Sequence, residues 1–125
     1  MSNPYGAVVL DHFRRPRNQR TLARPTATHE GYNALCGDRV RIELDVEGEK
    51  IRDAAFTANA CAICTASASL LTERVTGEDV AVAAAITDAD VLATLGPDIP
   101  ASRESCATLP VHTFREALGR LLPAP

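Results

Sequence analysis

An alternation of polar and apolar side chains runs without a break through residues 39–46, Arg-Val-Arg-Ile-Glu-Leu-Asp-Val. Because successive side chains of a strand point to opposite faces, this pattern predicts a strand that turns its aliphatic residues toward a core. Residues 47–50 supply a turn, and residues 51–58 return as a second strand with Phe56 as its largest side chain. Residues 28–33 are a candidate third strand. The sequence therefore predicts an antiparallel hairpin that one further strand extends.

Apolar residues at helical spacing occur both before and after this hairpin in the sequence. A first helix is predicted at residues 5–15 and ends at Pro16. Further helices are predicted from Cys61 to Gly77, at residues 78–86 and 88–95, and from about Cys106 to Leu122. Gly77 is well placed to end its helix, and Thr87 is a candidate cap. Pro110 is compatible with the last helix only if it lies within the first turn.

Length and composition predict a single globular domain over residues 1–125, with 46% apolar and 23% charged residues. The net charge of -3 supplies no basic field, so nucleic acid is not an expected partner. No stretch approaches the roughly 18 apolar residues of a membrane span, and we expect no membrane partner. Because the first residues also lack a secretion signal, we expect a cytoplasmic protein whose thiols stay reduced.

Three cysteines, Cys36, Cys61 and Cys106, lie far apart in the sequence, and Asp38 closely follows the first. In a reducing compartment such cysteines are more typical of metal binding or catalysis than of disulfides. Cys61 and Cys106 fall at predicted helix starts, where unpaired N–H groups favour a thiolate. Gly37 lets the backbone turn so that Cys36 and Asp38 can point into one site. Three thiolates and a carboxylate suit a tetrahedral zinc ion or one side of an iron–sulfur cluster.

Cys64 lies three residues after Cys61, nearly one helical turn away, and packing in the core is a sufficient explanation for it. Packing is also open as an explanation for each of the other cysteines taken alone. A redox pair of Cys61 and Cys64 is disfavoured because no strand–helix–strand setting surrounds it. We interpret His12, His29 and His112 as solvated or packed side chains rather than as metal ligands.

Four ordered segments carry a family resemblance. They are residues 9–18 (Val-Leu-Asp-His-Phe-Arg-Arg-Pro-Arg-Asn), 36–38 (Cys-Gly-Asp), 61–69 (Cys-Ala-Ile-Cys-Thr-Ala-Ser-Ala-Ser) and 103–109 (Arg-Glu-Ser-Cys-Ala-Thr-Leu). In these segments the chain resembles the U-type iron–sulfur cluster assembly proteins, which include IscU, SufU and the amino-terminal domain of NifU. The resemblance covers nearly the whole length, and four motifs in order are far more specific than a cysteine pair.

The resemblance implies an α+β fold in which a small antiparallel β-sheet carries helices packed on one side. It implies that Cys36, Cys61 and Cys106 are thiolate ligands and sulfur acceptors, with Asp38 as the carboxylate ligand. In this family a pyridoxal-phosphate cysteine desulfurase delivers sulfur, and the scaffold passes a [2Fe-2S] cluster to apo acceptor proteins. Carboxylate oxygen suits iron less well than thiolate does, so an Asp38 ligand would leave one corner exchangeable. A scaffold or carrier is thus favoured over a catalyst.

Departures from the family pattern leave the branch open. Arg103 and the Ala-Thr-Leu after Cys106 resemble SufU, and IscU members have a histidine where this chain has Ser105. Residues 98–103 also differ from the segment by which IscU binds a chaperone. Against SufU, the chain lacks the usual insertion between the second and third cysteines, and Ala60 replaces an expected glycine. The match is closest to SufU, although without its insertion.

Two functions therefore stay open at the level of sequence. The first is a scaffold that accepts sulfur and binds iron or a [2Fe-2S] cluster. The second is zinc-dependent sulfur transfer, in which Zn2+ bound by the same residues is displaced when Cys106, as the catalytic sulfur acceptor, takes up persulfide sulfur. A third interpretation is a zinc ion that only stabilises the fold.

Overall fold

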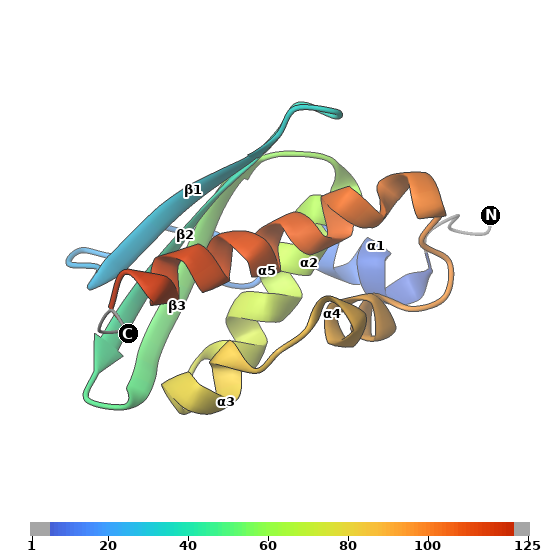
Figure 1. The fold of residues 1–125 in the computed structure, drawn as a ribbon. Helices are drawn as coiled ribbons and strands as arrows, with labels where there is room; N and C mark the ends of the chain where they lie inside the picture. Colours follow the sequence, from blue (N-terminus) through green and yellow to red (C-terminus); the bar gives the residue numbers. More distant parts are fainter. Residues whose placement is uncertain (1–5, 122–125) are drawn as a thin grey trace.

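The structure is a computed structural model and describes residues 6–121. Strands β1 (Ala27–Asn33), β2 (Asp38–Glu47) and β3 (Lys50–Asn59) form one antiparallel sheet in the order β1-β2-β3. The helices are α1 (Ala7–Arg14), α2 (Ala62–Val75), α3 (Val80–Ala84), α4 (Asp88–Leu95), the short 3-10 helix η1 (Ala101–Arg103) and α5 (Glu104–Gly119). In Figure 1 α5 runs across one face of the sheet, with α2 beside it. The expected α+β fold, with helices on one side, is confirmed.

The predicted hairpin forms the centre of the sheet. Val40, Ile42 and Leu44 of β2 are completely buried, and Phe56 of β3 pairs with Ile42. The face that carries these residues packs against the helices, as the alternation predicted. The candidate third strand is also confirmed, because β1 pairs with β2 along its whole length.

Helix α2 is buried on nearly all sides, and its small residues explain how. Residues 66–69, Ala-Ser-Ala-Ser, are all buried and let neighbouring elements approach its backbone closely. Ser67 Oγ donates to the carbonyl oxygen of Ala107 at 2.6 Å, which satisfies a buried hydroxyl and joins α2 to α5. Within residues 6–121 no helix is long and apolar enough to cross a bilayer.

The segment after α1 closes the outer edge of β3. The Phe56 N–H donates to Asn18 O at 2.9 Å, and the Arg20 N–H donates to Phe56 O at 3.0 Å. Asn18 has a φ of 64, in the left-handed region that asparagine tolerates. An ion pair of 2.6 Å between Arg20 and Asp53 adds to this contact. This segment thus covers a strand edge that would otherwise offer free pairing groups.

Two predicted helices have wrong boundaries. Helix α5 begins at Glu104, so Pro110 lies in its interior, because η1 and Glu104 start the helical path earlier than Cys106. Pro110 has no N–H to donate to the Cys106 carbonyl one turn earlier. The helix predicted at residues 78–86 is shortened to α3. It starts late because residues 77, 78 and 80 bond to Glu49 and Ile51, at the turn into β3. Two further boundaries, at Tyr5 and Leu122, lie outside the described residues.

Gly31 of β1 lies directly against α5. A Cβ atom at Gly31 would lie 2.0 Å from Thr113 Oγ1, and the Thr113 side chain is buried and donates to Leu109 O. We predict that Gly31→Ala lowers the free energy of unfolding by about 1–3 kcal/mol, because the packed core resists an added methyl group. Gly119→Ala is the matched control, since a Cβ there has no neighbour within 4 Å. Urea denaturation measures both; equal stabilities would contradict this account.

His12 joins α1 to α2 in a buried polar contact. Its Nδ1 lies 2.8 Å from Ser69 Oγ, which also accepts the Arg17 backbone N–H at 2.8 Å. This arrangement leaves the Ser69 hydroxyl proton to donate to Nδ1 and so suits the neutral imidazole. Burial, together with the positive charge of Arg17, lowers the pKa of His12 despite the nearby carboxylates of Glu73 and Asp11.

This lowered pKa predicts an acid-sensitive fold. Above pH ~6.5 His12 is neutral in both folded and unfolded chains, and its contribution to stability is complete. As the pH falls below that value the unfolded chain binds the proton first, so the free energy of unfolding decreases until the folded pKa is passed. Urea titrations at pH 7.5 and 5.5 should show a smaller loss in His12→Asn than in the unaltered chain. An equal loss in both would show that other groups cause it.

Candidate metal centre

Four residues predicted as ligands lie at one end of the sheet, on segments that meet there. Cys36 lies in the turn between β1 and β2, and Asp38 is the first residue of β2. Cys61 is the N-cap residue of α2, two residues after the end of β3, and Cys106 lies in the first turn of α5. Gly37 has a φ of 76, which lets the turn between Cys36 and Asp38 form without strain. Topology thus brings distant parts of the sequence together.

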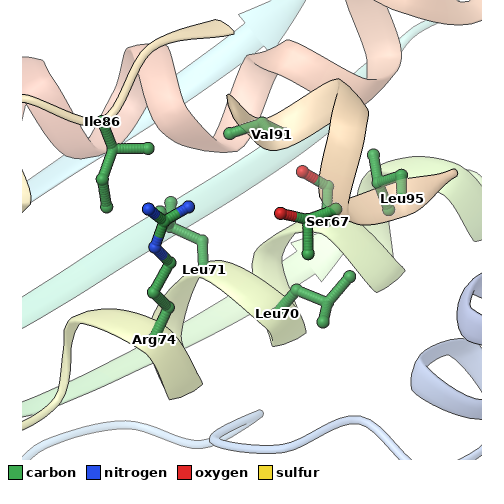
Figure 2. Close-up of a pocket in the computed structure, with 8 residues that line it drawn as sticks. Ser67, Leu70, Leu71, Arg74, Ile86, Val91 and Leu95 are labelled. Atoms are coloured by element: carbon green, nitrogen blue, oxygen red, sulfur yellow. The ribbon is translucent and has the colours of Figure 1, made fainter. Parts of the chain in front are cut away.

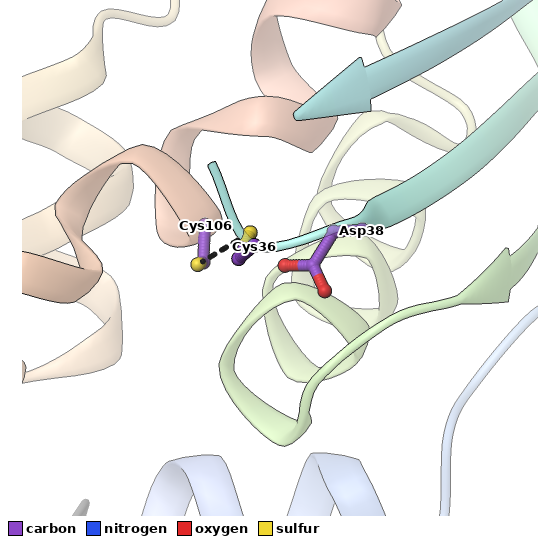
Figure 3. Close-up of side chains that lie close together, drawn as sticks. All are labelled: Cys36, Asp38 and Cys106. Carbon is purple, nitrogen blue, oxygen red and sulfur yellow. Dashed lines mark hydrogen bonds between the residues drawn. The ribbon is translucent and has the colours of Figure 1, made fainter. Parts of the chain in front are cut away.

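Cys36, Asp38 and Cys106 form the tightest part of this group. One ligand atom from each lies within 4.8 Å of the other two. Figure 3 shows the Cys36 and Cys106 side chains facing each other, with the Asp38 carboxylate beside them. The two sulfur atoms are 3.2 Å apart, in contact but well beyond the length of a disulfide bond. Both cysteines are free thiols.

Cys61 joins the group through Asp38. Its backbone N–H donates to Asp38 Oδ1 at 2.9 Å, and its thiol lies 3.4 Å from Asp38 Oδ2. The carboxylate therefore satisfies a free N–H at the start of α2. Asp38 is only 3% exposed, whereas Cys61 is half-buried. Asp38 thus lies at the centre of the group, in contact with each of the other segments.

Burial and hydrogen bonding act on Asp38 in opposite directions. Burial, the largest single effect, raises the pKa of its carboxyl group, whereas hydrogen bonds from the Cys36 thiol and the Cys61 backbone lower it. The thiols of Cys106 and Cys61 add to the lowering, and the net shift is below the ordinary value. Asp38 is accordingly an ionised acceptor near neutral pH, which is the form that binds a cation.

Cys106 does not ionise easily, contrary to the expectation from its place at a helix start. Burial, followed by its hydrogen bond with Cys36, raises the pKa of this thiol to about 12, although a hydrogen bond from Arg103 acts to lower it. Desolvation of the 1% exposed side chain outweighs the partial charge of the helix. A cation bound among these thiols would supply the opposite charge that stabilises the thiolate.

The donor set fits a tetrahedral thiophilic ion. Zinc with Zn–S bonds of about 2.3 Å places neighbouring ligand atoms about 3.5–3.8 Å apart. The 3.4 Å from Cys61 Sγ to Asp38 Oδ2 and the 3.2 Å between Cys36 and Cys106 are close to that spacing. Cys36, Asp38 and Cys106 already converge, and Cys61 adjoins them through its contact with Asp38. Thiolates likewise suit an iron–sulfur cluster.

Cys64 is separate from this group. It is completely buried and packs in the hydrophobic core. Burial, with a smaller effect from the charge of Asp38, raises the pKa of its thiol far above the ordinary value. Among residues 6–121, the converging ligand atoms belong to Cys36, Asp38 and Cys106, with Cys61 in contact, and not to Cys64. Packing, one of the explanations left open by the sequence, is the one that this environment supports.

Away from these residues, a hollow lies between α2 and α4, and Figure 2 shows the side chains that line it. Aliphatic residues dominate its wall, with Ser67, Arg74 and Thr94 as the polar members. No cysteine, histidine or carboxylate stands among the described residues that line it, so it offers no ligands of the kind that bind zinc or iron. The hollow is a packing feature beside the core and not part of the candidate metal centre.

Three polar residues beside the thiols were not predicted as part of the site. Asn33 Nδ2 donates to Ser105 Oγ at 3.0 Å, and Arg103 bonds to Cys106. An open groove beside these residues is lined by Leu35, Cys36, Ser102, Arg103, Ser105 and Cys106. The sequence carries one signal for Asn33, since asparagine at a strand end commonly organises the following turn. Ser105 and Arg103 have no such local signal.

The geometry agrees with the result of a family comparison. A family model described as the NifU-like N terminal domain matches residues 4–122. The chain belongs to this family. The resemblance to the U-type assembly proteins is thereby confirmed over almost the whole sequence.

Relatives within the NifU-like family carry different names. The chain is 35% identical to the bifunctional protein NifU/MnmA of Rubrobacter xylanophilus, over 94% of this chain but only 24% of that protein. It is 35% identical to the zinc-dependent sulfurtransferase SufU of Bacillus subtilis, over 63% of this chain and 53% of the relative. The chain thus spans about a quarter and about half of these two proteins. It is 31% identical to the iron–sulfur cluster assembly scaffold protein IscU of Streptococcus pyogenes, over 96% and 86%.

A solved structure shares the whole architecture. A protein from Fervidobacterium islandicum, described as an iron–sulfur cluster assembly scaffold for the SUF system, superposes with a TM-score of 0.79. The superposition covers 92% of this chain and 96% of that one, at 26% identity. The fold of the NifU-like domain is therefore common to both.

The thiols of this NifU-like domain should differ sharply in reactivity. Cys36 is exposed, whereas Cys106 and Cys64 are buried and have raised pKa values. We predict that iodoacetamide modifies Cys36 at least about tenfold faster than Cys106 or Cys64 in the reduced, chelator-treated protein, because the thiolate is the nucleophile. Trypsin followed by mass spectrometry separates the sites. Equal rates at Cys36 and Cys106 would contradict the burial of Cys106.

Proposed function

We propose that the chain is a scaffold for iron–sulfur cluster assembly. It accepts sulfur from a pyridoxal-phosphate cysteine desulfurase, binds iron or a [2Fe-2S] cluster, and passes that cargo to apo iron–sulfur proteins. The observation that carries this proposal is the convergence of three thiols and one carboxylate at the end of the sheet. Family membership supports it, because relatives named as IscU scaffolds match nearly the entire chain.

Each of the four residues has a separate proposed role. Cys36, Cys61 and Cys106 supply thiolates to the cargo, and Asp38 supplies the oxygen ligand. Iron binds thiolate sulfur more readily than carboxylate oxygen, so the bond to Asp38 is the easiest to exchange. A scaffold has to release what it builds, and an exchangeable coordination position gives an incoming acceptor thiol a place to bind.

Sulfur uptake is a thiol exchange. The thiolate of an acceptor cysteine attacks the terminal sulfur of the desulfurase persulfide, a new S–S bond forms, and the desulfurase cysteine leaves as its own thiolate. We propose Cys106 as the sulfur acceptor. Cys36 is exposed and lies 3.2 Å away, so sulfur that first reaches Cys36 can pass to Cys106 by a second exchange of the same kind.

Zinc-dependent sulfur transfer is the second candidate function. The relative named as a zinc-dependent sulfurtransferase is 35% identical where it matches, and the ligand spacing suits a tetrahedral zinc ion. Zinc held by Cys36, Asp38, Cys61 and Cys106 would keep the thiols deprotonated until sulfur arrives. In this reading the protein delivers sulfur and carries no iron. The scaffold stays the first proposal because scaffold relatives cover more of the chain.

Reconstitution under anaerobic conditions tests both functions. Purified protein is assayed for iron, zinc and acid-labile sulfide, then incubated with cysteine desulfurase, cysteine and ferrous iron. The scaffold predicts a cluster with visible absorbance and equal iron and sulfide. Absence of a cluster, with stoichiometric zinc and faster desulfurase turnover, would reject the scaffold in favour of sulfur transfer. Zinc with neither effect would leave a structural ion.

A matched pair of variants tests the ligand assignment in that assay. Cys61→Ala removes a proposed ligand, and Cys64→Ala removes a buried thiol from the same helix turn. We expect Cys64→Ala to keep its cluster yield. Loss of a residue that only supports a ligand typically lowers metal affinity about 10- to 100-fold, and we expect Cys61→Ala to lose at least that much. A large loss in Cys64→Ala with correct folding by circular dichroism would make Cys64 the fourth thiolate.

A further inference from the structure

Asn33 uses three of its atoms to organise the turn that carries Cys36. Its backbone oxygen accepts the Gly37 N–H at 2.7 Å, and its side-chain Oδ1 accepts the Leu35 N–H at 3.0 Å. The remaining side-chain group, Nδ2, donates to Ser105 Oγ at 3.0 Å. Asn33 therefore shapes the turn and also ties it to the first turn of α5.

The turn has little packing to hold it in place. Leu35 is 91% exposed, and Cys36 is exposed as well. Cys106, in contrast, is fixed in the core at 1% exposure. The distance between the two thiols therefore depends on polar contacts that hold an exposed turn against a buried helix.

The contacts form a closed ring. Ser105 directly precedes Cys106 in α5, and Asn33 lies three residues before Cys36. The ring is closed by the 3.0 Å hydrogen bond between Asn33 and Ser105 and by the 3.2 Å contact between the two sulfurs. Because both covalent segments are short, the hydrogen bond restricts how far the sulfurs can separate.

We propose that Ser105 is a positioning residue, which acts with Asn33 to hold Cys36 against Cys106. Both partners of this hydrogen bond lie outside the set of four ligands proposed above. The role of the hydroxyl is to accept the Asn33 amide proton and so to set the spacing of the thiols. This inference rests on the proposed function for its significance, because the spacing matters for binding an ion or cluster and for passing sulfur between the two cysteines.

The equilibrium of the two thiols with glutathione measures their proximity directly. One glutathione disulfide and the Cys36–Cys106 thiol pair exchange to give the protein disulfide and two reduced glutathiones, so the equilibrium constant is an effective concentration. We expect Ser105→Ala to lower this constant about three- to tenfold, the effect of one ordinary hydrogen bond. Trypsin places Cys36 and Cys106 on different peptides, and the bridged pair is quantified by mass spectrometry.

Matched variants separate positioning from a general loss of structure. Ser102→Ala removes an exposed hydroxyl from the same groove and should leave the constant unchanged. Ser105→Thr keeps the hydroxyl, and its equilibrium constant should stay close to that of the unaltered chain. In an Asn33→Ala background, Ser105→Ala should not lower the equilibrium constant further, because the amide that donates to the Ser105 hydroxyl has already been removed. An unchanged constant in Ser105→Ala, an equal fall in Ser102→Ala, or additive losses with Asn33→Ala would overturn the proposal.

Cobalt binding gives a second readout that distinguishes positioning from ligation. Co2+ titration of Ser105→Ala should show the same thiolate-to-metal absorption as the unaltered chain, with affinity about three- to tenfold lower. A changed absorption band would make Ser105 a ligand and overturn the positioning role. Since the glutathione measurement uses the protein without metal or desulfurase, it stands or fails independently of cluster assembly and sulfur transfer.

Discussion

The pairing register of the sheet is the constraint on which the candidate metal centre depends. Asn33 pairs with Asp38 at the last position between β1 and β2, and Arg39 pairs with Asn59 between β2 and β3. Both connections that carry cysteines therefore leave the sheet at the same end. A slip by one residue would turn Asp38 to the opposite face and separate it from the Cys61 N–H. Burial of the aliphatic face of β2 opposes that slip and thereby fixes the positions of the candidate ligands.

Much of this fold could be predicted because its local signals agree with one another. Strict alternation over residues 39–46 specifies β2, and the capping box at Thr87 specifies the start of α4. The failures have physical causes that lie outside local sequence. Residues 77, 78 and 80 bond at the turn into β3 instead of extending α3, and α5 tolerates Pro110 in its interior because buried packing around it offsets one lost hydrogen bond. Tertiary contacts decide such boundaries.

The candidate ligands were accessible to sequence reasoning because few residue types bind thiophilic metals. Their ionisation could not be predicted in this way. The pKa of Cys106 is governed by burial and by Cys36, which lies far away in the sequence. The same limit applies to Ser105, a residue that departs from one branch of the family and that the structure pairs with Asn33. A hydrogen bond between a strand end and a distant helix leaves no periodic pattern in the chain.

The four proposed ligands differ in how firmly the fold holds them, and this difference has a mechanical consequence. Asp38 and Cys106 belong to buried parts of β2 and α5, whereas Cys36 lies on an exposed turn. Segments of that kind open at low free-energy cost while the core stays folded. Under the proposed scaffold function, cargo bound between the two could be exposed by moving the turn alone. A site that must both hold and release what it binds needs some of its ligands on rigid elements and others on a segment that opens easily.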